Sequence, residues 1–230
     1  MNKPFNSRSS IRKEEHNNDT FITPKNAIIP LIDALGIQDG DRIYDCCCGH
    51  GDNHHRIGKV IAEHKDITYD GFDLVQDGIE VYPHKYSRKN VVPSIRDNKE
   101  PSNYVPDDIH TKIYEQTDWL ISNPPYGRHP EGGILKHLFI DYYLDIVFDA
   151  EQIKGVALLL PITTLAGKSY SELYKKYGYP SLLLFTSRVQ FIDEKQSNVD
   201  VAWFIWKRDE QPFMRHVDLI RKKQKTRGEK

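Results

Sequence analysis

The chain has few cysteines, and their arrangement excludes one class of fold. Only three occur among 230 residues, consecutively at positions 46–48. Such neighbours do not bridge one another comfortably and no fourth thiol is present, so a disulfide framework is excluded and a reducing compartment is expected. The Cys-x-x-Cys spacing typical of zinc sites is also missing. We therefore expect buried thiols and no metal, with a zinc site that also uses His50, His54 or His55 as the weaker alternative.

Long apolar runs are missing as well. No run approaches the roughly 18 apolar residues of a membrane-spanning helix, and the polar opening Met1–Asp19 lacks the apolar centre of a signal peptide. The 32 basic and 33 acidic side chains nearly cancel, giving a formal net charge of −1. We expect a cytoplasmic protein that has no membrane contact and folds as one α/β domain.

Apolar segments of strand and helix type alternate along the chain. Strands are predicted near 42–45, 68–73, 91–95, 118–122, 155–160, 181–187 and 199–206, and helices near 25–35, 53–64, 134–149 and 166–177. This alternation is typical of a doubly wound sheet. The last two strands are separated by a polar stretch and are predicted to form a hairpin.

A glycine-containing turn follows the first predicted strand. Asp45 ends this strand, and Gly49 and Gly51 come before the next predicted helix. Glycines in such a turn let the backbone approach a nucleotide-type ligand beside a helix N-terminus. No Lys-Ser or Lys-Thr follows the glycines, so a triphosphate-binding loop is disfavoured. The next predicted strand ends at Asp73, where ribose hydroxyls are held in such folds.

The most informative stretch is Asn123-Pro124-Pro125-Tyr126, directly behind the apolar run Trp119-Leu120-Ile121. An exocyclic amino group is a poor nucleophile because its lone pair is delocalised. The amide carbonyl of Asn123 and the backbone carbonyl of Pro124 could accept its two hydrogens, while Tyr126 offers a face for stacking a planar substrate. The alternative interpretation is a simple turn at the end of a strand, because proline and asparagine are ordinary loop residues.

Four motifs in one order resemble a known family. Phe21-Ile22-Thr23-Pro24, the turn from Asp45 to Gly51, Asp73 and the Asn123–Tyr126 motif are similar to those of S-adenosylmethionine-dependent amino-methyltransferases, most closely the adenine-specific DNA methyltransferases. The resemblance covers roughly residues 21–206. It implies a Rossmann-like class I methyltransferase fold, with a seven-stranded, mostly parallel sheet, helices on both faces and a terminal antiparallel hairpin. The implied cofactor is S-adenosyl-L-methionine.

The resemblance also implies a role for individual residues. Asn123, Pro124, Pro125 and Tyr126 match the catalytic motif. Cofactor contacts are implied for Thr23 and Pro24 in the N-terminal loop, with Thr23 near the methionine carboxylate, and for the turn and the acids that follow it, namely Asp45, Cys46, Gly49, Gly51, Asp73, Leu74 and Asp97. Cys46 stands where many relatives carry proline, a change that we expect to affect packing rather than chemistry.

The activity implied is direct methyl transfer to the amino group of a flipped adenine in DNA. The same motif serves other amino groups. An RNA methyltransferase acting on adenine or guanine, a protein glutamine methyltransferase and a non-catalytic nucleic-acid-binding partner subunit therefore stay open.

Charge and length suggest where substrate recognition should be sought. We divide the chain into a polar, flexible segment 1–20, a catalytic domain 21–208 and a basic tail 209–230. Residues 207–230 carry nine basic against four acidic side chains. The tail, together with Arg128 and His129 behind the catalytic motif, suits contacts with phosphate, although solvated charges are the alternative. No separate target-recognition region is evident, so a recognition partner is a possibility.

Overall fold

The computed structural model describes residues 21–45, 47–49, 56–71, 117–124, 126, 135–191 and 199–219. Its helices are α1 (Lys25–Leu35), α2 (Arg56–Ala62), α5 (Leu135–Asp149) and α6 (Lys168–Tyr177), with one 3₁₀ turn, η3 (Ile162–Leu165). Its strands are β1 (Arg42–Asp45), β2 (Thr68–Gly71), β3 (Trp119–Ser122), β4 (Gly155–Pro161), β5 (Ser181–Phe185), β6 (Val201–Lys207) and β7 (Met214–Val217). Within these ranges, no helix has both the length and the apolar character needed to cross a lipid bilayer.

The strands form one sheet in the order β2-β1-β3-β4-β6-β5-β7. The first four of this order pair in parallel. Strand β6 is antiparallel to both of its neighbours, β4 and β5, whereas β7 is parallel to β5. Among the described strands, β6 therefore runs against all the others. The predicted arrangement of a mostly parallel sheet ending in an antiparallel hairpin is confirmed.

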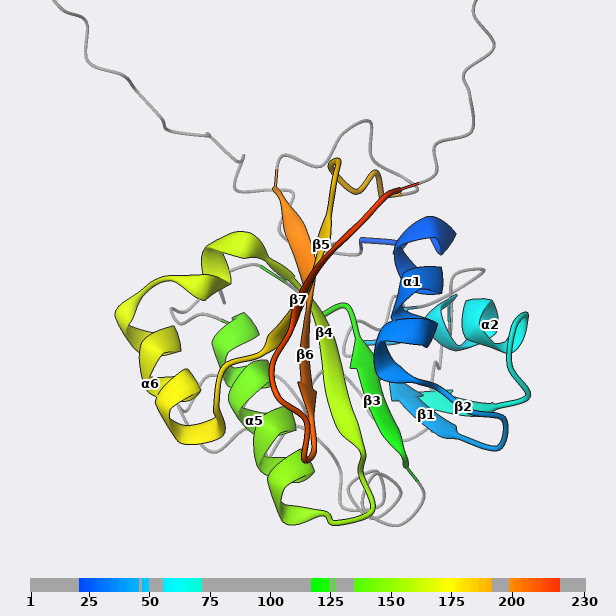
Figure 1. Ribbon diagram of the computed structural model, residues 1–230, viewed down its shortest axis with the longest axis horizontal. Coiled ribbons are helices and arrows are strands. Elements are labelled where there is room, and N and C mark those ends of the chain that lie inside the picture. Colours follow the sequence, from blue (N-terminus) through cyan, green and yellow to red (C-terminus); the bar gives the residue numbers. More distant parts are fainter. Residues whose placement is uncertain are drawn as a thin grey trace, which may run out of the picture.

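Helices cover both faces of the sheet, α5 and α6 on one face and α1 and α2 on the other (Figure 1). The central strand β4 is buried along its whole length. Its side chains alternate between the two cores: Val156, Leu158 and Leu160 pack with α5 and α6, whereas Ala157 and Leu159 pack with α1 and α2. A strand buried on both faces has no polar side, which explains its unbroken apolar sequence.

Helix α1 is fastened to the middle of the sheet. The indole nitrogen of Trp203, on β6, donates a hydrogen bond of 2.8 Å to the backbone oxygen of Ala27, and both residues are fully buried. The helix is capped by Gly36, whose φ of 72° lies in the left-handed region that glycine adopts without strain. The segment before α1 is thereby held in a fixed position relative to the sheet.

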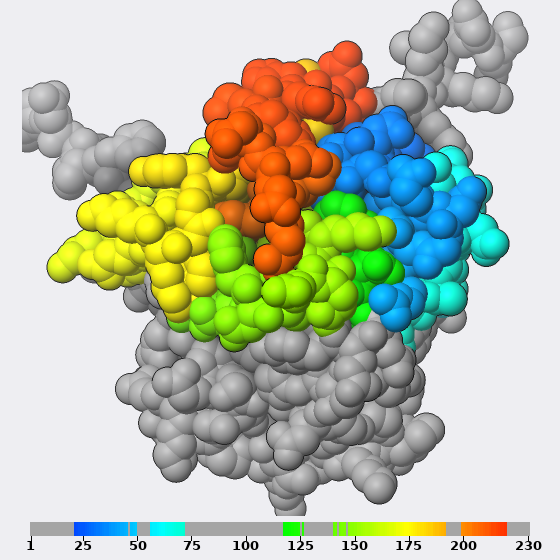
Figure 2. Space-filling model, turned by 60° about the horizontal axis from the view of Figure 1, so that its bottom comes forward, coloured from blue at the N-terminus to red at the C-terminus, as the bar shows by residue number. Residues whose placement is uncertain are grey.

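The sequence predicted most of these elements, with two differences. The predicted strand near 91–95 lies outside the described residues. Strand β7 was not predicted, and it falls within the segment that we assigned to the basic tail. Its residues are largely exposed and lack an apolar pattern, and the strand forms because it pairs with β5 at the edge of the sheet. In Figure 2 the orange segment that contains β7 lies on the surface between α6, in yellow, and α1, in blue.

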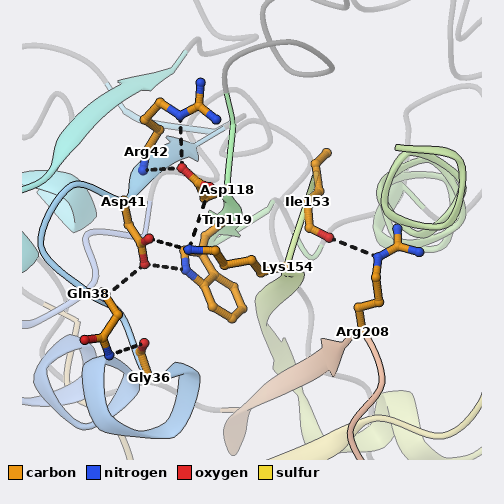
Figure 3. A network of polar contacts seen from close by, with 9 residues as sticks. All are labelled: Gly36, Gln38, Asp41, Arg42, Asp118, Trp119, Ile153, Lys154 and Arg208. Atoms are coloured by element: carbon orange, nitrogen blue, oxygen red, sulfur yellow. Dashed lines mark hydrogen bonds and ion pairs between the residues drawn. The ribbon is translucent and has the colours of Figure 1, made fainter. Parts of the chain in front are cut away.

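A polar network joins the amino ends of three parallel strands. Asp41 precedes β1, Asp118 precedes β3 and Lys154 precedes β4, and Figure 3 draws the three side chains converging. The ammonium of Lys154 lies 2.5 Å from one carboxylate oxygen of Asp41 and 3.7 Å from Asp118. Asp118 also accepts hydrogen bonds from the backbone and the side chain of Arg42, at 2.9 and 3.0 Å. The network therefore ties the starts of β1, β3 and β4 together.

Asp41 is the buried member of this network, with 4% of its surface exposed. Burial on its own would raise the pKa of Asp41. Hydrogen bonds from Lys154, from the backbone of Gln38 and from the indole of Trp119 outweigh burial and hold the pKa below its ordinary value of 3.8. Because the folded-state pKa is lowered, the ionised carboxylate adds stability above about pH 4, and this contribution is lost as the pH falls through the folded-state pKa.

We expect Asp41→Asn to lower the free energy of unfolding at pH 7 by about 1–3 kcal/mol, because the donors that surround this buried side chain, among them the buried indole of Trp119, lose a charged acceptor. The difference from the unsubstituted protein should shrink as the pH falls below the ordinary carboxyl pKa of 3.8 and on through the lowered folded-state pKa of Asp41. Urea unfolding followed between pH 7 and pH 3 checks both expectations. The matched control is Asp39→Asn, the same change at an exposed acid two positions away, which should alter stability by less than about 0.5 kcal/mol. An equal loss in both variants would contradict the role of burial.

Candidate functional site

The topology of the sheet indicates where a ligand would bind. Strand β1 lies between β2 and β3, so the chain leaves β1 toward one side of the sheet and returns to it on the other. In open α/β sheets, ligands bind outside the carboxyl ends of the strands at such a switch point. Strand β1 ends at Asp45, and β3 ends at Ser122 directly before Asn123. Asp45 and Asn123, two of the residues that the sequence singled out, therefore lie on the two sides of the switch point.

A hydrogen bond joins the ends of β1 and β3. The hydroxyl of Ser122 donates to Oδ1 of Asp45 at 2.7 Å, and the backbone N–H of Cys47 donates to the same oxygen at 3.0 Å. Both side chains are buried, Asp45 with 4% and Ser122 with 2% of the surface exposed. Such donors compensate a buried carboxylate for the water that it has lost. Ser122 was not among the residues predicted for the site, although a hydroxyl that ends an apolar strand next to the motif is a signal that could have indicated it.

The turn behind β1 passes close to the end of β2. Gly49 has a φ of 75°, in the left-handed region, and the side chain of Cys48 is buried. On β2, a Cβ added to Gly71 would overlap the backbone oxygen of Asp45 and would lie 2.9 Å from the Cβ of Cys48. Only glycine therefore fits beside this turn. A strand, a turn with left-handed glycine and a following helix form the arrangement that suits a nucleotide-type cofactor.

The side-chain amide of Asn123 is held from both of its ends. Its nitrogen donates to the backbone oxygen of Phe21 at 2.8 Å and to the hydroxyl of Thr23 at 3.0 Å. Its oxygen accepts a hydrogen bond of 2.6 Å from the hydroxyl of Tyr126. These contacts bring the first and the last of the described motifs together, across about a hundred positions of the chain.

Three aromatic rings form a cluster that includes Phe21 and Tyr126, two of the residues hydrogen-bonded to this amide. The rings of Phe21 and Tyr126 are stacked, with centroids 5.5 Å apart and planes inclined by 18°. The ring of Phe191 also contacts that of Phe21, with centroids 5.2 Å apart. Phe191 is buried, and it follows β5 at the start of a polar stretch, so its neighbours in the sequence gave no sign of this contact. The rings form an apolar wall suited to a planar group.

The structure thus brings Thr23, Asn123 and Tyr126 into contact, with Asp45 joined to Ser122 beside them. Pro124 is buried next to Asn123, and Pro24 immediately precedes α1. The other residues predicted for the site lie outside the described residues, namely Cys46, Gly51, Asp73, Leu74, Asp97, Pro125, Arg128 and His129. The roles assigned to all of these residues stay predictions.

Comparison with known proteins supports the fold. No protein-family model and no curated protein sequence matches the chain. Among solved structures, it resembles a class I S-adenosylmethionine-dependent methyltransferase from Listeria monocytogenes, with a TM-score of 0.54, 13% identity and coverage of 85% of this chain and 65% of that one. It also resembles a modification subunit of a type I restriction enzyme from Vibrio vulnificus YJ016, with a TM-score of 0.50, 15% identity and coverage of 89% and 48%.

A third similar structure comes from a type I R-M system, with a TM-score of 0.51, 14% identity and coverage of 89% of this chain and 46% of that one. The chain thus spans about half of the length of the two restriction-system proteins. At these identities the likeness is one of fold. The Rossmann-like fold of class I methyltransferases, expected from the sequence, is confirmed.

The close approach at Gly71 gives a prediction about stability. We expect Gly71→Ala to lower the free energy of unfolding by about 1–3 kcal/mol or more, because the added methyl group must displace the backbone of Asp45. Urea unfolding measures the change. Thr68→Ser, at an exposed position of the same strand, serves as the control and should cost less than about 0.5 kcal/mol. Unfolding of both variants at the urea concentration of the unsubstituted protein would contradict the packing at this turn.

Proposed function

We propose that this protein transfers a methyl group from S-adenosyl-L-methionine to an exocyclic amino group. The acceptor that we propose first is the amino group of adenine in DNA. The observation that carries the proposal is the fixed amide of Asn123 at the switch point of a class I methyltransferase fold. Its nitrogen is engaged by Phe21 and Thr23, so its oxygen is the end that can receive hydrogens from a substrate. A neutral acceptor at this place matches the needs of an amino group that must lose its planarity in order to react.

The residues around the amide fit such a reaction. A carbonyl oxygen has two lone pairs, so Oδ1 of Asn123 can accept from an amino group and from Tyr126 together. The backbone carbonyl of Pro124 is the second acceptor that we assign. The Phe21 ring covers one face of Tyr126, so a planar substrate that uses this face has to take the place of Phe21. The described groups bonded to the Asn123 amide include no carboxylate or imidazole, which is consistent with loss of the surplus proton to solvent.

The residues at the end of β1 fit a cofactor site. When bound, S-adenosylmethionine supplies a sulfonium methyl group that an amino nitrogen can attack directly. We assign its binding to the turn after β1, with Asp45 and Gly49 as the described members and Thr23 as a contact from the N-terminal side. Asp73, Leu74 and Asp97 are assigned from the sequence alone. What these residues contribute is orientation, because alignment of donor and acceptor lowers the barrier without an acid or a base.

Three observations make DNA the acceptor that we expect first. Two of the similar folds belong to type I restriction systems, one of them in a modification subunit. The sequence places Arg128 and His129 one residue behind the catalytic motif and gathers basic residues toward its end. One of these structures concerns complex assembly in a type I R-M system, so we also propose that a partner or the polar loops supply target recognition. The expected setting is the cytoplasm.

Removal of the Asn123 amide tests the catalytic assignment. We expect Asn123→Ala to bind S-adenosylmethionine with unchanged affinity and to lower the rate of methyl transfer by at least about a hundredfold, as loss of a preorganised polar contact does at other active sites. Labelled methyl groups are followed into matched pools of DNA, RNA and protein. Gln38→Ala is the control, because it removes an exposed amide at the opposite end of the sheet and should leave the rate unchanged.

Each result of this experiment has a defined meaning. Label in DNA adenine that disappears with Asn123→Ala supports the whole proposal. Label in RNA or in protein would support the proposed methyl transfer but would show that the acceptor is not DNA. A fully active Asn123→Ala protein would contradict the catalytic role of the amide. An absence of label in every pool, with recognition partners added, would favour a nucleic-acid-binding subunit without catalysis.

The cofactor assignment has a test of its own. We expect Asp45→Ala to weaken binding of S-adenosylmethionine at least about tenfold, equivalent to about 1.4 kcal/mol, because the turn after β1 loses the carboxylate that organises it. Isothermal titration calorimetry gives the Kd. Asp33→Ala, at an exposed acid on α1, is the matched control. Tight binding by Asp45→Ala would place the cofactor elsewhere.

A further inference from the structure

The segment Phe21–Pro24, which we call the strap, decides how the amide of Asn123 is turned. An asparagine side chain can present either its nitrogen or its oxygen to a given neighbour. Here the strap presents the backbone carbonyl of Phe21 at 2.8 Å from the Asn123 nitrogen. A backbone carbonyl can only accept, so the group that faces it must be the NH₂. The oxygen is consequently turned toward Tyr126, whose hydroxyl donates to it.

Thr23 provides a second hydrogen bond to the same end of the amide, which strengthens the orientation that the Phe21 carbonyl selects. The amide nitrogen has two hydrogens, and the second is accepted by the Thr23 hydroxyl at 3.0 Å. Rotation of the amide would break both of these hydrogen bonds and the one from Tyr126, and would set the amide oxygen against the oxygen of Phe21. Thr23 has only 3% of its surface exposed, so water cannot readily replace its hydroxyl.

The strap is itself held by the fold. The backbone oxygen of Thr23 accepts a hydrogen bond of 3.3 Å from Nε of Arg56, at the start of α2. The backbone oxygen of Pro24 accepts one of 3.0 Å from the N–H of Ala27, whose own oxygen is bound by Trp203. The Thr23 hydroxyl therefore occupies a position set by α1, α2 and β6. Groups held in this way keep a reacting geometry without reorganisation.

We propose that Thr23 is a positioning residue for methyl transfer, which holds the Asn123 amide with its carbonyl oxygen available to the amino group of the substrate. This inference rests on the function proposed above. It assigns Thr23 a role in the chemical step, separate from the contact with the cofactor that the sequence predicts for it. The two roles are compatible, because the Thr23 hydroxyl accepts from Asn123 and keeps its own hydrogen for another acceptor.

Two substitutions separate the hydroxyl from the shape of the side chain. Thr23→Val keeps the volume and removes the acceptor, whereas Thr23→Ser keeps the acceptor and removes a methyl group. We expect kcat for Thr23→Val, measured at saturating S-adenosylmethionine, to fall about tenfold, equivalent to about 1.4 kcal/mol in the barrier. Thr23→Ser should keep kcat within about twofold of the unsubstituted protein, because its hydroxyl can accept the same hydrogen. The Kd for the cofactor is measured in parallel for all three proteins.

A second measurement needs neither cofactor nor acceptor. The two side-chain N–H signals of Asn123 are recorded by ¹H–¹⁵N NMR and assigned by their disappearance in Asn123→Ala. We expect Thr23→Val to shift these signals and to speed their exchange with solvent, whereas Thr23→Ser should leave them nearly unchanged. The urea midpoints of both variants show whether the fold is kept.

The results distinguish this inference from the function on which it rests. A lower kcat with altered Asn123 signals in Thr23→Val, restored by Thr23→Ser, supports it. A weaker Kd for the cofactor with an unchanged kcat would restrict Thr23 to cofactor binding and overturn it, as would unaltered Asn123 signals in a folded Thr23→Val protein. If the unsubstituted protein methylates no acceptor, the proposed function fails, and the NMR comparison still decides whether Thr23 holds the amide.

Discussion

The register between β1 and β3 is the constraint on which the rest of the structure depends. Hydrogen bonds fix it at both ends: at the amino end through Asp118 and Arg42, and at the carboxyl end through Asp45 and Ser122. Side chains alternate between the two faces along a strand. A slip of β3 by one position against β1 would therefore turn each of its side chains toward the opposite core and would separate Ser122 from Asp45. The network drawn in Figure 3 therefore acts on the functional end of the sheet although it lies at the other end.

Elements that bury a regular apolar pattern could be predicted from the sequence. Helix α1 and strand β4 match their predictions to within one residue, because their apolar residues recur at the spacing with which side chains face the cores. Strand β7 has no apolar pattern, because its residues are largely exposed and the strand forms by pairing with β5. The contact between Asp45 and Ser122 spans 77 positions, and a contact of that range depends on topology, which local pattern does not carry.

The candidate site shows the same division. Its motifs were found because asparagine, prolines and glycines stand where strands end, and residues of these types report local backbone geometry. The contacts that these motifs make with the carbonyl and the ring of Phe21, with Ser122 and with Phe191 join distant parts of the chain, and the local sequence does not predict such contacts. The two halves of the site meet when α1 docks on the sheet, so the candidate catalytic amide is assembled by the same long-range contacts that complete the domain.

The three tryptophans of the chain are all buried in the sheet, Trp119 on β3 and Trp203 and Trp206 on β6. The aromatic wall of the candidate site is built from phenylalanine and tyrosine. Intrinsic tryptophan emission of this protein is consequently a gauge of whether the sheet is folded. Any change of this emission on ligand binding has to pass through the core, because Trp203 lies in the cluster against which Phe21 and Tyr126 pack.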